Sequence, residues 1–511
     1  MRWFSAVAGW VRRLAAALLV FGLLVTPLLV ERYRGLGALR RWQAARRAAG
    51  EKLSVGELIP GPVATDSTRT LSAAEMRARL APLAGWGVLP SPMSFVAAGK
   101  ARAISLADDW GDYPDPRNLR TWQVLSSQLT QLRGALDRAR SDALDTNLVI
   151  AENYRQQTAP PALGAYSGAA RHLAASALLA LHERRMTEAW QNTVALLFVD
   201  RWLQAEPWVV SQSVRANLSN TACDVVWELL QSPGWTEEQL ASLQAACVTV
   251  SPLESLAATL RLERARADEL FDSFRHSLKS LVSFGAPLST GSGSASNPNS
   301  GPMQMIEPLV DSTAKVRSTL YGSLWRFAWS YHDQLLHDQV AQVDIQGALD
   351  LANGRSTLAK VRERQRATDP RRLDTFYDRI RYQVSRNFGT FAFSLLSRVV
   401  TSQTRREMAM AAVAIERYRL REGRVPDHLE SLLPDLLRTL PRDYFDGKPL
   451  RYRSTGPADF LLYSVGENCL DEDGNAEAEP GLPTSAQTGR DLVWPRVVSE
   501  KEFAAQRRFR R

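Results

Sequence analysis

Apolar residues recur at helical spacing through most of the chain, so the sequence predicts a mainly α protein. Residues 119–283 show this pattern almost without interruption, with short breaks at prolines. Two stretches within it, 169–185 and 186–203, each place four apolar side chains on one helical face: Leu173, Ala177, Ala180 and Leu181, and then Trp190, Val194, Leu197 and Phe198. We therefore expect a helical array or irregular bundle, which serves either as a protein-binding surface or as a spacer.

The longest apolar run lies near the N-terminus. Residues 14–30 contain no charge and are bounded by Arg13 and Glu31. A membrane-spanning helix needs roughly 17 to 25 apolar residues, so this run predicts a membrane anchor. A secretory signal sequence has a similar pattern, but no small-residue cleavage site follows the run before Arg32, which favours an uncleaved anchor.

An aromatic-rich helix is predicted at residues 309–340. Its apolar residues form two stripes: Tyr321, Trp325 and Trp329 in one, and Leu320, Leu324, Phe327 and Tyr331 in the other. A band this wide predicts burial on two sides. Docking to a membrane surface is the alternative, which Arg326 alone does not favour because such helices usually carry a cationic face.

Residues 401–495 predict a small α+β module. An amphipathic helix with apolar residues at spacings of 3 and 4 ends at Gly423. A short second helix is expected at 427–437, followed by a β-hairpin with strands at 449–453 and 460–465. An acidic loop follows the hairpin.

The motifs of this module occur in a specific order: a helix, a Gly-x-x-Pro break, a hairpin that ends in Tyr-Ser-Val-Gly, the acidic loop and a closing Asp-x-x-Trp. The positions concerned are Tyr418, Gly423, Pro426, Leu429, Pro441, Asp443, Gly447, Pro449, Tyr452, Tyr463, Ser464, Gly466, Asp471, Asp473, Asp491 and Trp494. This constellation resembles the globular domain of the type II secretion major pseudopilin. The resemblance covers under a fifth of the chain.

The resemblance implies a location outside the cytoplasmic membrane. Arginines that follow the apolar run outnumber those before it, which by itself would place the bulk of the chain in the cytoplasm, but long domains translocate largely regardless of charge. We therefore expect a single-pass inner-membrane protein with its bulk in the periplasm. A pseudopilin has its apolar segment directly before the long helix, behind a processing site. Here the run lies far upstream without such a site, so filament assembly is not expected.

The acidic loop is a candidate calcium site. Asp471, Asp473 and Asn475 alternate along it and supply hard oxygen ligands, while Gly474 permits a tight turn. The pseudopilins bind a structural calcium ion in the equivalent loop with help from the closing aspartate. The resemblance therefore nominates Asp471, Asp473 and Asp491 as metal ligands. An acidic surface loop that binds no metal is the alternative.

The sequence contains no familiar catalytic motif. A P-loop, a dinucleotide-binding fingerprint and a nucleophile elbow are all missing. His332-Asp333 and His337-Asp338 form a repeated pair. Because the two histidines are five residues apart, their imidazoles lie on different faces of a helix. We therefore expect solvated or capping residues. Asp268, which lies among arginines, is expected to form a surface ion pair.

Charge and cysteines exclude further classes. The net charge of +9 over 511 residues comes mainly from arginine and is spread along the chain apart from two basic runs, 32–52 and 501–511. Such runs can contact anionic lipid or nucleic acid, but solvated or disordered segments are the commoner outcome, so no nucleic-acid partner is expected. Cys223, Cys247 and Cys469 fit neither a zinc site nor a disulfide framework. Cys223 and Cys247 either pair in an oxidising compartment or are small buried residues.

These patterns divide the chain into the following segments: a membrane anchor (1–33), a basic helix and irregular connection (34–118), a helical array (119–283), a flexible linker (284–305), a helical continuation (306–400), the pseudopilin-like module (401–495) and a basic tail (496–511). The array weakly resembles tetratricopeptide hairpins. We interpret the protein as a non-enzymatic envelope scaffold or protein-binding component linked to secretion, with an unidentified protein partner. The alternative is an envelope hydrolase with an unrecognised active site in the helical region.

Overall fold

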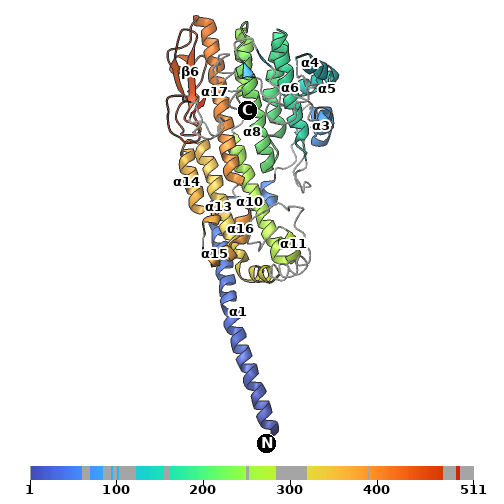
Figure 1. Cartoon of the computed structure of the whole chain (residues 1–511), viewed down its shortest axis with the longest axis vertical. Helices are drawn as coiled ribbons and strands as arrows, with labels where there is room; N and C mark the ends of the chain where they lie inside the picture. Colours follow the sequence, from blue (N-terminus) through green and yellow to red (C-terminus); the bar gives the residue numbers. More distant parts are fainter. Residues whose placement is uncertain are drawn as a thin grey trace, which may run out of the picture. The chain divides into compact units, whose positions relative to one another are not determined.

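The computed structural model describes residues 2–59, 69–84, 94–95, 101–102, 122–152, 154, 162–248, 252–283, 319–373, 375–388, 391–475 and 491–494. The protein is mainly helical, as the sequence predicts, with little sheet (Figure 1). It divides into two compact units, each drawn from separated stretches: Met1–Leu58, Leu260–Asp344 and Arg364–Phe391 form unit 1, and Ile59–Thr259, Ile345–Glu363 and Ala392–Arg511 form unit 2. The expected linker 284–305 and basic tail 496–511 lie outside the described residues.

Unit 1 contains α1 (Arg2–Ala48), a continuous helix that includes the predicted anchor and is drawn in blue in Figure 1. It is followed by the short α2 (Val55–Leu58). The second half of α1 packs against η5 (Trp325–Trp329), a π-helical turn, and the start of α13 (Ser330–Ala352). The approach is close at Gly35, where a Cβ would lie 2.7 Å from the ring of His332. Glycine is therefore required at this crossing.

The core of unit 1 forms around one aromatic stripe of the helix that was predicted at 309–340. Tyr321, Trp325 and Trp329 are buried with Phe271 and Phe274 of α10 (Pro252–His276). This part of the prediction is confirmed. Smaller helices complete the unit: α11 (Leu278–Ser283), η6 (Pro370–Arg372), α15 (Phe376–Arg381) and α16 (Gln383–Phe388).

The prediction that the second stripe is also buried is wrong for three of its four residues, and the fourth, Tyr331, is only partly buried. Leu320, Leu324 and Phe327 are exposed by 62%, 42% and 39%. The reason is that the core cluster covers only the opposite side of this helix, where Gly322 allows Leu278 to approach closely. An apolar face of unit 1 is therefore left open.

Most of the array predicted at 119–283 lies in unit 2, whereas its last residues, 260–283, belong to unit 1. The helices in the first part of unit 2 are α3 (Ala73–Leu80), η1 (Ala81–Leu83), α4 (Trp122–Gln131), α5 (Arg133–Leu144), α6 (Gly164–His182), α7 (Met186–Val199), η3 (Asp200–Leu203), α8 (Val209–Leu230) and α9 (Glu237–Cys247). The expected helices at 169–185 and 186–203 correspond to α6 and α7, which pack together. Leu173, Ala177, Ala180 and Leu181 are buried, as are Val194 and Leu197, whereas Trp190 and Phe198 are only partly buried. Because α6 is buried on almost all of its sides, its burial does not single out the predicted face.

Two small strand pairs accompany these helices. β1 (Arg69–Ser72) and β4 (Leu148–Ala151) are parallel, whereas β2 (Ser94–Phe95) and β3 (Ala101–Arg102) are antiparallel. Ser72 ends β1 and also begins α3, because its hydroxyl and the Glu75 side chain form a capping box. The strand pairs thus connect helices and do not form a layer of their own.

The C-terminal part of unit 2 matches the predicted hairpin. β5 (Arg451–Ser454), β6 (Phe460–Ser464) and β7 (Leu492–Val493) form an antiparallel sheet in that order. The helix before them, α17 (Phe391–Glu422), runs unbroken across the expected boundary at residue 400, and Gly423 ends it with a φ of 72°. Together with α14 (Leu358–Thr368), it links stretches of both units.

One expected element of this module is wrong. The sequence predicts a helix at 427–437, but the structure contains only a single turn, η7 (Leu429–Leu432). Pro434 explains the early end, because proline has no N–H to continue the helix. The leucines are still buried: Leu429, Leu432, Leu436 and Leu437 belong to the core.

Candidate functional site

The predicted metal ligand Asp491 closes the acidic loop. Its carboxylate accepts hydrogen bonds from the backbone N–H groups of Glu472, Gly474 and Asn475, at 3.2, 2.7 and 3.1 Å. Asp473 and Gly474 have left-handed backbone, with φ of 59° and 79°, and this turn gathers the three N–H groups around the anion. Asp491 is buried and thus acts as the acceptor at the centre of the loop.

The other two predicted ligands are placed differently. Asp471 accepts a hydrogen bond from the hydroxyl of Tyr463 at 3.1 Å and pairs with Arg451 at 3.4 Å, whereas Asp473 is exposed. Because N–H and O–H protons point at Asp471 and Asp491, the arrangement as it stands does not fit a cation. Within the described residues, no group of three or more His, Cys, Asp or Glu side chains could hold a metal ion. Calcium binding stays a prediction.

Asp443, which the sequence did not single out as a site residue, is central to the same module. It is fully buried, accepts the N–H groups of Phe445 and Val465 at 3.0 Å each, and pairs with Arg451 at 2.9 Å. Burial raises the pKa of Asp443 to about 6, so it is still ionised at neutral pH opposite Arg451. Since Arg451 begins β5 and Val465 follows β6, one carboxylate holds both strands of the hairpin.

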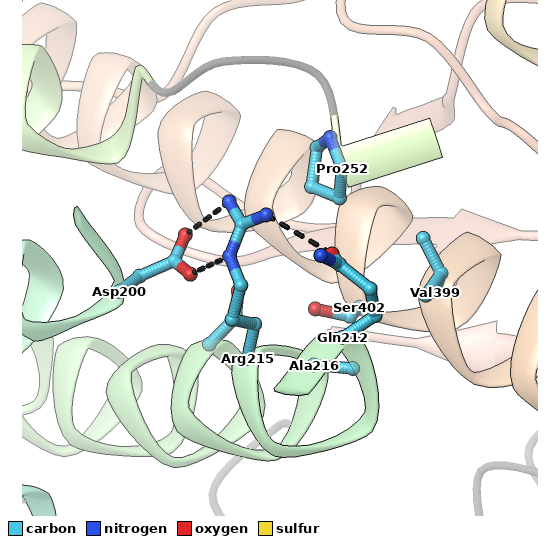
Figure 2. A pocket seen from close by; sticks show the side chains of 8 residues that line it. Asp200, Gln212, Arg215, Ala216, Pro252, Val399 and Ser402 are labelled. Atoms are coloured by element: carbon cyan, nitrogen blue, oxygen red, sulfur yellow. Dashed lines mark hydrogen bonds and ion pairs between the residues drawn. The ribbon is translucent and has the colours of Figure 1, made fainter. Parts of the chain in front are cut away.

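A buried ion cluster lies among the helices of unit 2 (Figure 2). Asp200 is 2.6 Å from Nε of Arg215 and 3.2 Å from Nη1 of Arg406, and Arg215 also donates to the Gln212 side chain at 3.0 Å. Burial opposes ionisation of Asp200, but the two guanidinium groups outweigh it and lower its pKa. With two cations around one anion, the cluster carries a net positive charge.

The cavity beside this cluster is small. Its volume is about 10 Å³, and Asp200, Arg215 and Ser402 are among the residues that line it. A single water molecule needs about 10 to 15 Å³, so the cavity has room for one water and not for a substrate. The cluster is therefore structural. Sequence reasoning missed it because its residues come from separate helices and form no local motif.

The two His-Asp pairs on α13 are not solvated, which corrects one part of the prediction; the capping role, which was the other part, is confirmed for Asp333. His332 contacts the backbone carbonyl oxygen of Glu31 through Nε2 at 2.9 Å. The His337 ring lies 4.6 Å from that of Phe388 between centroids, and burial lowers the pKa of His337 to about 4, so it is neutral. Because α13 is an inner helix of unit 1, several of its faces are covered.

Asp333 joins three elements of unit 1. Its carboxylate accepts the indole N–H of Trp325 at 2.8 Å and the N–H groups of Val384 and Ser385 at 3.0 Å each. These N–H groups belong to the first turn of α16, where a carboxylate compensates unpaired donors. Burial raises the pKa of Asp333 to about 6. Asp333 thus caps α16 from a different helix.

Asp268 does not form a surface ion pair, contrary to the prediction. It accepts a hydrogen bond from Gln334 and faces Asp338, which is fully buried. Burial and the neighbouring carboxyl raise the pKa of Asp338 well above its usual range. The nearby Asp268 carboxyl therefore disfavours the ionised form of Asp338. Sequence reasoning missed this pair because its partners lie on α10 and α13.

The surroundings of α1 change at Glu31. Before it, Leu19 and Leu23 are each 67% exposed, although leucine is usually buried. At Glu31 the carboxylate pairs with Arg381 at 2.8 Å and with His332 at 3.4 Å. From there on, α1 packs into unit 1. Among the described side chains of the charge-free run, Leu19, Leu23 and Val30 are thus exposed, whereas Glu31 is held by ion pairs.

The cysteines of unit 2 are free. Cys223 and Cys247 are both buried, on α8 and α9. Burial raises the pKa of Cys247 to about 12, so its reactive thiolate is suppressed. Of the two interpretations of these residues, the structure shows small buried side chains.

Within the described residues, one stretch, 237–276, is long and apolar enough by composition to cross a membrane, and 53% of its most apolar part is buried. It comprises α9 and α10, and α10 contains the fully buried Arg264, so a core position explains it. Comparison with known proteins found no match among family models, curated proteins or solved structures.

Proposed function

We propose that this chain is a membrane-anchored envelope protein that works as a helical scaffold or protein-binding component and not as an enzyme. Residues 14–30 of α1 cross the inner membrane once, and the bulk of the chain lies in the periplasm. The observation that carries this proposal is the change at Glu31, where exposed leucines give way to ion pairs with Arg381 and His332.

The dimensions of α1 support the anchor. Residues 14–30 of a helix extend about 25 Å at 1.5 Å per residue, close to the hydrocarbon core of about 30 Å. Because α1 is helical on both sides of this run, its flanking residues complete the span. A helix satisfies its own backbone hydrogen bonds, as a membrane requires.

The pseudopilin-like module supports a link to secretion or envelope machinery. Two residues that carry the resemblance contact each other, because the Tyr452 hydroxyl donates to the Pro426 carbonyl at 2.6 Å. A third, Trp494, donates its backbone N–H to the carbonyl of Leu462 in β6 at 2.8 Å. We propose that this module contacts a protein of that machinery while α1 holds the chain at the membrane.

Reporter fusions at the C-terminus test the location. A phosphatase that folds only in the periplasm is expected to be active, and a fluorescent protein that matures only in the cytoplasm is expected to be dark. The reverse pattern would overturn both the location and the link to secretion.

A further inference from the structure

We propose that unit 1 makes a second contact with the membrane, through a docking surface of exposed apolar side chains beside the exit of α1. This docking surface consists of Leu320, Leu324, Phe327, Phe376 and Tyr377. Its occupant is the headgroup region of an anionic lipid bilayer. The inference rests on the proposed function, because α1 must span the membrane for this surface to meet it.

The position of the surface along α1 is the first argument. Leu28, near the end of the charge-free run, packs against the aromatic core cluster of unit 1. Arg32, just after the run, donates to the backbone carbonyl of Phe327 at 3.2 Å. The body of unit 1 therefore reaches the level at which α1 leaves the hydrocarbon, and Phe327 lies at that level.

The spacing of the exposed residues is the second argument. Leu320, Leu324 and Phe327 follow one another at intervals of 4 and 3, so they form one stripe on a helix. The opposite stripe, with Trp325 at its centre, is buried in the core of unit 1. The exposed stripe therefore belongs to a helix whose other side is held in the core.

A neighbouring element, α15, packs against the buried stripe of this helix and adds exposed apolar side chains of its own. The ring of Tyr377 on α15 lies 5.9 Å from that of Trp329, edge to face, and the Tyr321 hydroxyl donates to the Ile380 carbonyl at 3.0 Å. Next to Tyr377, Phe376 is 80% exposed, which is unusual for phenylalanine. Two elements that pack together thus both present apolar side chains.

The chemistry at this level is that of a membrane interface. On α1, Tyr33 and Arg34 are exposed, and the guanidinium of Arg32 lies 6.0 Å from the ring centre of Phe327. Tyrosine and other aromatics concentrate at headgroup level, where arginine meets lipid phosphates. A surface for a protein partner would not need to lie at the level where α1 leaves the membrane. Because this docking surface does lie at that level, we assign it to lipid.

Fluorescence quenching in vesicles tests the inference. The full chain with Cys469→Ser receives a single new cysteine at Leu324 or Phe376, and Gln339, an exposed residue of α13 in the same unit, provides the matched control. The buried Cys223 and Cys247 remain unlabelled in the folded protein. Each variant carries an environment-sensitive dye and is reconstituted into phosphatidylethanolamine–phosphatidylglycerol vesicles. Circular dichroism and melting confirm that each variant is folded.

We expect dyes at positions 324 and 376 to be several-fold less quenched by aqueous iodide than the dye at position 339, and to be quenched by nitroxide-labelled lipid headgroups. Equal iodide quenching at all three positions in a chain that resists carbonate extraction would overturn the docking surface and leave the anchor intact. Protection that requires membrane proteins and is missing in pure lipid would assign the surface to a protein and also overturn it. A chain that does not integrate would overturn both proposals.

Discussion

The guanidinium of Arg381 lies 2.8 Å from the carboxylate of Glu31, at the end of the charge-free run of α1. The backbone carbonyl of the same Glu31 is also bonded to His332 on α13 at 2.9 Å. α15 and α13 thus hold one residue of α1 through its side chain and its backbone. The rest of unit 1 is therefore attached to α1 at Glu31.

Substitution of Glu31 is expected to loosen this attachment. Glu31→Gln keeps the size of the side chain and removes the charge opposite Arg381, so we expect a loss of about 1 kcal/mol in the free energy of unfolding, because the pair is only partly buried. Denaturant unfolding of the detergent-solubilised chain measures it. Glu269→Gln, an exposed site in the same unit, is the control. Equal stability of the two variants would contradict this role of Glu31.

The buried cluster of unit 2 predicts an order of severity between two substitutions. Arg406→Met leaves Asp200 paired with Arg215, whereas Asp200→Asn leaves two buried guanidinium groups without their anion. We expect Asp200→Asn to cost about 3 to 5 kcal/mol and Arg406→Met clearly less. Thermal and denaturant unfolding of the two variants compares them. A larger loss in Arg406→Met would show that the net positive charge of the cluster is compensated elsewhere.

Glu228 predicts how stability depends on pH. It is buried on α8, and burial raises its pKa to about 10 from the usual 4.5. As pH rises from about 4.5 towards 10, the unfolded chain loses this proton and the folded chain keeps it, so the stabilisation present below pH 4.5 is progressively lost. Glu228→Gln removes the titration, and we expect it to be more stable than wild type by on the order of 3 kcal/mol at pH 7.

Unfolding at pH 4, 6 and 8 checks this prediction. The difference between Glu228→Gln and wild type should be small at pH 4 and grow with pH. Glu430→Gln, at an exposed position, should follow the wild-type curve. A constant difference at all three values would mean that Glu228 is ionised in the folded state.

In the acidic loop, the structural role of Asp491 and the binding of calcium can be tested separately by their effects on stability. Asp491→Asn weakens the acceptor for three backbone N–H groups, so we expect a loss of about 1 to 3 kcal/mol with or without the ion. If calcium binds, addition of the ion raises the melting temperature of the wild type, and Asp471→Asn reduces the rise. A melting temperature that neither calcium nor chelator changes would remove the metal site and leave the structural role of Asp491 in place.

Periodicity was sufficient to predict the positions of α6 and α7. Leu173 and Val194 lie where helical spacing placed them, and the hairpin of β5 and β6 follows from its alternating residues and its loop. These elements depend on local sequence. The leucine spacing predicts a longer helix than the single turn Leu429–Leu432 that forms, because the spacing alone does not account for the break at Pro434.

Burial of charge could not be predicted in the same way. Asp333, Asp338 and Asp200 are ordinary polar residues in the sequence, and their partners lie far away along the chain. The exposure of Leu320 and Leu324 could not be predicted either, because their spacing is the same on a buried and on an exposed helical face. Only the tertiary arrangement decides which side of a helix is covered.

Carbonate extraction of vesicles that contain the full chain tests the central claim most directly. We predict that the wild-type chain stays with the lipid at alkaline pH, whereas a chain with Leu19→Glu and Leu23→Glu is released, because two charges in the middle of the run make a spanning helix unfavourable. Release of the wild-type chain, or equal retention of both, would contradict the assignment of residues 14–30 as the membrane anchor.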